Sequence, residues 1–255
     1  MTKQLLIYES ATPVSASRHA RHSVAPVPDF SFSAEVNAVP LMAVEFLRAA
    51  NEYPIVFAGT GDDVVPSVVL GVRGNQNLYL SPDRKWQADY IPAFIRRYPF
   101  VFSSSSDEKS LTLCIDTAYP GVNTDGLGER LFSDDGKPTG YTERVLKFLQ
   151  DYQAQFERTR AFARRVSELG LLEPMQAQVT TPAGEKLTLN GFFGVSREKL
   201  RQLSAQALAT LAKTDELELL YLQLHSMRNF VGVKDRLLGK LQDEPPAEAA
   251  ADTVH

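Results

Sequence analysis

The strongest indication of the fold class lies in TERVLKFLQDYQAQFERTRAFARRVSEL, residues 142–169. Its apolar side chains recur every three or four residues, a spacing that places them on one face of an α-helix. That face consists of Val145, Leu149, Tyr152, Phe156, Ala163 and Val166. Gly170 follows directly, and glycine is the residue that most often ends a helix. We therefore expect one long central helix from about Thr142 to Leu169.

Segments on both sides of this helix have the composition of β-strands. The segments before it are YPIVFAG (53–59), PSVVLGV (66–72) and LTLCID (111–116). After the helix, MQAQV (175–179) and KLTLNGFF (186–193) flank the turn Pro182-Ala183-Gly184, which predicts a β-hairpin. The alternating pattern of LELLYLQL (217–224) predicts one more strand.

Shorter helices are expected at three further places. LMAVEFLRAANE (41–52) is amphipathic and is followed by Pro54. A helix that begins at Ser196 has Leu200, Leu203, Ala207 and Leu211 on one face, and a last helix contains Met227, Phe230 and Leu237. We therefore predict an α+β fold with mixed or antiparallel sheets, several packed helices and one long central helix.

The remaining segments are less regular. Residues 10–40 are rich in Pro, Ser and Ala, which predicts an extended arm lying on the body of the protein. Residues 116–141 contain several glycines and few apolar side chains, which indicates a long loop. We expect a single globular domain over residues 1–240, with the arm at its start, and a disordered tail rich in Pro, Ala and Glu over residues 243–255.

Composition excludes several classes of protein. The chain has 27 Lys and Arg against 31 Asp and Glu. Because nucleic-acid binding usually relies on a basic excess, we expect no nucleic-acid partner. The single cysteine, Cys114, excludes an intramolecular disulfide. The apolar run from Leu5 to Tyr8 is shorter than the ~7–15 residues of a secretory signal, so we expect a cytoplasmic protein. No stretch approaches the ~18 apolar residues of a membrane span.

No motif identifies a catalytic residue. A calcium-loop template over GVNTDGLGERLF (121–132) requires acids where Gly121 and Phe132 stand, although Asp125 matches one of its positions. His19 and His22 have no third ligand nearby in the sequence. We therefore expect neither a metal nor a cofactor.

A catalytic serine is not indicated either. His225 precedes Ser226, but no GxSxG motif surrounds that serine, which favours a half-buried structural role for His225. An enzyme of unrecognised type, using acids of the 116–141 loop such as Asp125 together with His225, remains an alternative.

The segment WQADYIPAFIRRYPFVF (86–102), called the aromatic–basic segment below, is the most unusual part of the chain. It predicts a helical turn between two prolines, followed by a strand. Trp86 and Tyr90 precede the adjacent Arg96 and Arg97, and such residues form ligand pockets and interface anchors as well as ordinary cores. If Arg96 or Arg97 reaches a pocket lined by Trp86 and Tyr90, its guanidinium group should hold a carboxylate or another anionic group.

Several longer motifs occur in a distinctive order along the chain. They are EFxxAANEYPIVF (45–57), WxADYIPAFIRRYPF (86–100), GERLFSDDGKPT (128–139) and LxLLYLQLHSMRN (217–229). Together they resemble the SapC-like bacterial proteins from about residue 5 to residue 240. The resemblance implies a link to the formation of bacterial surface layers. Because members tend to be encoded near flavin-dependent halogenases and outer-membrane receptors, it also implies an accessory role in uptake or modification.

We therefore expect a non-catalytic accessory or binding protein that holds a peptide or a small anionic ligand. The aromatic–basic segment and the 116–141 loop would supply the site. Its candidate residues are Trp86, Tyr90, Arg96, Arg97, Asp125 and His225. The partner would be that ligand or another protein. The alternatives are the enzyme named above and a structural component of a surface layer.

Overall fold

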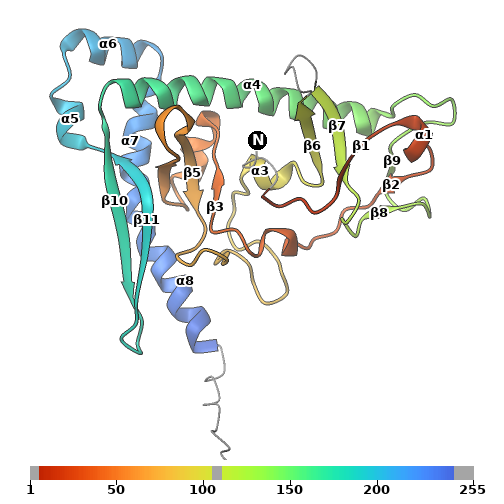
Figure 1. The fold of residues 1–255 in the computed structure, drawn as a ribbon, viewed down its shortest axis with the longest axis horizontal. Coiled ribbons are helices and arrows are strands. Elements are labelled where there is room, and N and C mark those ends of the chain that lie inside the picture. Colours follow the sequence, from red (N-terminus) through yellow and green to blue (C-terminus); the bar gives the residue numbers. More distant parts are fainter. Residues whose placement is uncertain (1–5, 105–110, 244–255) are drawn as a thin grey trace, which may run out of the picture.

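The α+β prediction is confirmed by the computed structural model, which describes residues 6–104 and 111–243. The long helix α4 (Gly140–Glu168) runs along one side of the molecule, and the sheets lie below it in Figure 1. The Thr139 side chain caps α4 by accepting a hydrogen bond from the backbone N–H of Thr142. The predicted central helix is therefore confirmed. The predicted tail lies outside the described residues from position 244 onward.

The buried face of α4 differs in part from the predicted one. Its buried residues are Thr142, Leu149, Tyr152, Thr159, Phe162, Ala163 and Val166. Phe162 was missing from the predicted face, whereas Val145 and Phe156 are only half-buried. Phe156 occupies the same position of the seven-residue repeat as the buried Leu149 and Ala163, so helical periodicity does not explain its partial exposure. Phe162 is buried because its ring packs beside those of Phe46 and Phe57.

Five antiparallel strands form the largest sheet, in the order β10-β11-β4-β5-β3. They are β10 (Leu172–Thr180), β11 (Lys186–Val195), β4 (Ile55–Ala58), β5 (Val65–Val69) and β3 (Ala38–Pro40). Strands β10 and β11 are the predicted hairpin, which extends beyond its neighbours in Figure 1. Gly184 in its turn has a φ of +84°, a conformation that glycine adopts without strain.

Two smaller antiparallel sheets lie toward the other end of α4 (Figure 1). One contains β1 (Ala11–Pro13), β7 (Leu111–Asp116) and β6 (Phe100–Ser104), and the other contains β8 (Val122–Asn123), β2 (Ser23–Val24) and β9 (Glu129–Arg130). Residues 10–40, predicted to form an extended arm, supply one strand to each of the three sheets and also form α1 (Ala16–His19). Strand pairing therefore ties this segment into the body. The predicted loop over 116–141 likewise contains β8 and β9.

Short helices complete the fold. They are α2 (Phe46–Ala49), α3 (Ala93–Arg96), α5 (Arg197–Arg201), α6 (Ala205–Lys213), α7 (Glu216–Ser226) and α8 (Phe230–Asp243), with 3₁₀ turns η2 (Ser31–Ser33), η3 (Ala43–Glu45), η4 (Gly61–Asp63) and η5 (Met227–Asn229). The helix predicted from Ser196 is interrupted, because Ser204 starts α6 as a new N-cap.

The strand predicted over 217–224 is wrong, because this segment is α7. The helix packs against β4, β11, α2 and α6. Neighbours on several sides require apolar side chains around most of its circumference. The leucines at 217, 219, 220, 222 and 224 therefore give a pattern that resembles the alternation of a β-strand.

Two hydrophobic clusters meet beneath α4. The larger one fills the space between the five-stranded sheet and α2, α3, α4, α7 and α8. The smaller one includes Phe100, Ile115, Leu131 and Leu149, which come from β6, β7, the 131–132 segment and α4. Tyr98 and Phe148 pack against both clusters. The aromatic–basic segment therefore lies where the two clusters join.

Candidate functional site

The aromatic–basic segment folds as predicted, into the helical turn α3 followed by β6. Consecutive residues on a helical turn point about 100° apart. As a result, Arg96 is exposed to solvent while Arg97, only 4% exposed, enters the core. The two adjacent arginines therefore have different surroundings and are considered separately.

A buried carboxylate holds the start of this segment in place. Glu45 is only 4% exposed. Its Oε1 accepts hydrogen bonds from the Tyr90 hydroxyl at 2.6 Å and the Ala93 N–H at 2.7 Å, and its Oε2 accepts one from the Met42 N–H at 2.8 Å. Burial is the main cause that raises the pKa of Tyr90 well above its ordinary value, and the negative charge of Glu45 raises it further. Tyr90 therefore stays protonated and donates to Glu45.

Two exposed arginines lie against the ring of Tyr90. The guanidinium carbon of Arg48 is 4.9 Å from the ring centroid, and that of Arg96 is 5.9 Å from it. Arg96 is further oriented by the Phe148 ring at 5.6 Å and by a 2.9 Å hydrogen bond from its Nε to the carbonyl of Ile91. Within the described residues, neither Arg48 nor Arg96 forms an ion pair with a carboxylate. We call Arg48, Tyr90 and Arg96 the arginine–tyrosine cluster.

Arg97 belongs to the packing of the core. Its guanidinium carbon is 4.2 Å from the ring centroid of Phe94, 5.0 Å from that of Tyr152 and 5.7 Å from that of Tyr8. Burial raises the pKa of Tyr8, and the positive charge of Arg97 acts in the opposite direction. Arg97 therefore links α3 to α4 and to the N-terminal segment, on the inner side of the arginine–tyrosine cluster.

Trp86 is also part of an aromatic packing arrangement. Its indole Nε1 donates a 2.8 Å hydrogen bond to the hydroxyl of Tyr53, which in turn donates to the carbonyl of Tyr90. The indole lies 5.7 Å from the ring of Phe30 and 6.4 Å from that of Tyr79. Trp86 is half-buried and reaches Tyr90 through this hydrogen-bond chain.

The other two candidate residues lie far apart. His225 is on α7 and Asp125 is between β8 and β9, and these elements occupy opposite ends of the molecule in Figure 1. His225 is exposed, so the half-buried position expected for it is wrong. Asp125 is exposed in a loop whose backbone N–H groups at Asp125 and Leu127 donate to Asn123 Oδ1. The two residues therefore do not form a common site.

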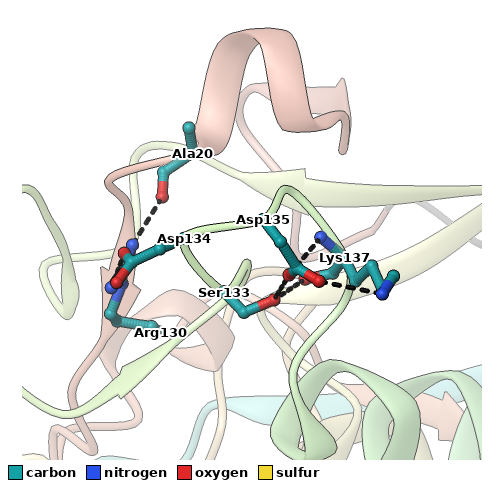
Figure 2. A network of polar contacts seen from close by, with 6 residues as sticks. All are labelled: Ala20, Arg130, Ser133, Asp134, Asp135 and Lys137. Carbon is teal, nitrogen blue, oxygen red and sulfur yellow. Dashed lines mark hydrogen bonds and ion pairs between the residues drawn. The ribbon is translucent and has the colours of Figure 1, made fainter.

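The GERLFSDDGKPT motif forms a hairpin in which two ion pairs join its own charged residues (Figure 2). Arg130 contacts Asp134 at 2.7 Å and donates to the carbonyl of Ala20 at 3.3 Å. Asp135 contacts Lys137 at 2.9 Å, and its Oδ1 is 2.5 Å from the Ser133 hydroxyl. The hydrogen bond from the Ser133 hydroxyl is the main cause that lowers the pKa of Asp135, and Lys137 lowers it further. These contacts stabilise the turn itself and use the groups that would otherwise bind a ligand.

His19 and His22 form a pair in the N-terminal segment. Their ring centroids are 4.9 Å apart in an edge-on arrangement. His19 is buried, and its Nδ1 accepts a 3.3 Å hydrogen bond from the backbone N–H of Ser15. In the parts of the chain that the structure describes, no group of three or more His, Cys, Asp or Glu side chains is arranged to hold a metal ion.

We expect His19 to make the protein less stable as the pH falls below about 6.5. Burial lowers the pKa of His19 from its ordinary value of 6.5, and His22 and Arg18 act in the same direction. The unfolded chain therefore takes up a proton at a higher pH than the folded chain does. The stabilising contribution is complete above about pH 6.5 and is lost as the pH falls toward the lowered pKa.

His19→Asn keeps an acceptor for the Ser15 N–H but removes the titration. Its urea midpoint should therefore fall less than that of the wild type between about pH 7.5 and about pH 5.5. His225→Asn, on the exposed surface of α7, is the matched control and should keep the wild-type dependence. An unchanged pH dependence in His19→Asn would contradict this assignment.

The structure thus brings the exposed Arg96 against the buried ring of Tyr90 and places Trp86 and Arg97 in the packing of the core. Sequence reasoning missed Arg48 and Glu45. Both lie in the EFxxAANEYPIVF motif, about 45 residues before α3, and no local pattern relates them to Tyr90. The one available signal was an acid followed three residues later by an arginine in a short predicted helix.

Comparisons with known proteins identify the family but no characterised relative. The SapC family model matches residues 14–232, which is most of the chain. No curated protein and no solved structure matches the chain. None of the helices in the described parts combines the length and apolar character needed to cross a lipid bilayer. The extent of the family match shows that the chain belongs to the SapC family.

Proposed function

We propose that this protein is a non-catalytic accessory protein that binds an acidic peptide segment through the arginine–tyrosine cluster. The family resemblance supports a role beside surface-layer formation or uptake and modification systems. We place that role in the cytoplasm as part of the same proposal. The observation that carries the binding proposal is the pair of exposed arginines, Arg48 and Arg96, held against one buried tyrosine ring without carboxylate partners in the described chain.

This arrangement suits carboxylates for three physical reasons. Contact with the Tyr90 ring orients each guanidinium group, and no carboxylate of the described residues pairs with either. Arg96 uses Nε for the Ile91 carbonyl, so its two Nη groups can donate in parallel to one carboxylate. The orienting contacts also reduce the conformational entropy that the arginines lose on binding. Two such groups on one surface favour a ligand with more than one carboxylate.

Binding of a fluorescein-labelled peptide of alternating Glu and Gly residues tests the proposal. We expect the wild type to bind this peptide and not a matched peptide in which Gln replaces Glu. Arg96→Lys and Arg48→Lys keep the charge but lose the planar pair of donors, and each should weaken binding by about tenfold. Because both side chains are exposed, the unfolding midpoints should stay close to that of the wild type.

Arg201→Lys is the matched control. Arg201 is exposed on α5, at the far end of α4 from the smaller sheets in Figure 1, and its substitution should leave binding unchanged. Equal binding of the Glu and Gln peptides would overturn the proposal. Wild-type affinity in the Arg48→Lys, Arg96→Lys double variant would do the same.

A further inference from the structure

A cavity of about 520 Å³ lies on a different part of the surface from the arginine–tyrosine cluster. Three segments enclose it, namely residues 6–9, residues 31–38 and the turn at Gly74 and Asn75. Its volume falls in the range of sites that bind small molecules, about 300–1,000 Å³. No candidate residue from the aromatic–basic segment lines it.

The walls of the cavity are held by contacts with the rest of the protein. The Tyr8 hydroxyl donates a 2.7 Å hydrogen bond to the carbonyl of Phe100. The rings of Tyr8 and Phe32 both pack on Tyr98, with centroid distances of 5.4 Å and 3.9 Å. The carbonyl of Asn37 accepts hydrogen bonds at 2.7 Å and 3.0 Å from Leu70 and Gly71. These contacts hold Tyr8, Phe32 and Asn37 in place in two of the three enclosing segments.

Acidic side chains determine the charge that the cavity accepts. Glu9 and Glu35 both line it and both are exposed. Within the described residues, neither carboxylate forms an ion pair. Arg97 also lies beside Tyr8, but it is buried, with its guanidinium carbon 5.7 Å from the ring centroid. A ligand in the cavity therefore faces two carboxylates, and an anionic ligand is disfavoured.

We infer that this cavity is a binding site for a small organic cation, an amine or a guanidinium compound that also carries an apolar group. The positive group pairs with Glu9 and Glu35, which are uncompensated in the described structure. The apolar part packs on Tyr8 and Phe32, whose ring faces also attract a cation. Asn37 and Asn75 also line the cavity, and an amide side chain can offer a carbonyl oxygen to a further N–H donor.

Two probes of similar size and opposite charge test this inference, 2-phenylethylammonium and 3-phenylpropanoate. We expect isothermal titration calorimetry of the full-length protein to detect binding of 2-phenylethylammonium. The same measurement should detect no binding of 3-phenylpropanoate. Glu9→Gln and Glu35→Gln should each weaken binding of the ammonium compound by about tenfold. The double variant should abolish it. Phe32→Leu, which removes an aromatic wall but keeps an apolar one, should weaken binding by a smaller factor.

Glu218→Gln, on the exposed surface of α7, is the matched control and should bind like the wild type. Arg48→Lys and Arg96→Lys should also bind the ammonium compound normally, so a failure of the acidic-peptide proposal does not affect this one. Equal binding of both probes, no binding of the ammonium compound at millimolar concentration, or full binding by the folded double variant would each overturn the inference.

Discussion

Phe162→Ala should lower the free energy of unfolding by about 3–5 kcal/mol, the range for removing a fully buried phenylalanine. Phe162 is 2% exposed. Its ring lies 6.0 Å from that of Phe46 on α2 and 6.1 Å from that of Phe57 on β4. The substitution therefore opens a cavity where the long helix, a short helix and the large sheet meet. Urea unfolding monitored by circular dichroism measures the change.

Phe156→Ala is the matched comparison on the same helix. Because the Phe156 side chain is only half-buried, water can enter part of the space that it vacates. We expect Phe156→Ala to lower the free energy of unfolding by about 1–2 kcal/mol, well below the effect of Phe162→Ala. Equal losses of unfolding free energy in the two variants would contradict the assignment of Phe162 to the core and of Phe156 to a half-buried position.

Local sequence patterns predicted the elements whose signals are complete within a short segment. The hairpin β10–β11 followed from the turn at Pro182, Ala183 and Gly184, and α4 followed from a periodicity maintained over eight turns. By contrast, α7 is surrounded by β4, β11, α2 and α6, so its leucines reflect contacts with elements distant in the sequence. Periodicity within one segment contains no information about how many neighbours will surround it.

The same limit applies to the candidate site. Tyr90 and Arg96 could be predicted because aromatic and basic residues are concentrated within one segment. The exposure of Arg96 and the burial of Arg97 depend on how α3 packs against the rest of the protein, and this is a property of the tertiary fold. Arg48 reaches Tyr90 because the carboxylates of Glu45 and Glu52 bind the aromatic–basic segment beside it. Long-range contacts of this kind have no signature in a single sequence.

Glu45→Ala should therefore have an effect comparable to the loss of a core aromatic residue, about 3–5 kcal/mol, because it leaves three buried donors without an acceptor. The substitution leaves the Tyr90 hydroxyl and the N–H groups of Ala93 and Met42 without their acceptor in a buried region. Each unsatisfied donor costs about 1–3 kcal/mol, although relaxation of the structure makes the total less than their sum. We also expect the acidic peptide to bind more weakly, because Tyr90 and α3 lose the group that positions them.

Glu52→Ala separates this effect from the general loss of a carboxylate near Tyr90. Glu52 accepts hydrogen bonds from the backbone N–H groups of Asp89 at 2.7 Å and Tyr90 at 2.9 Å, but it is only half-buried. Water can replace its oxygens, so we expect a loss of about 1 kcal/mol. The urea midpoints of Glu45→Ala and Glu52→Ala measure this difference in stability. If Glu52→Ala is as damaging as Glu45→Ala, burial of the Glu45 carboxylate is not what makes it important, and its assigned role in holding α3 against η3 is wrong.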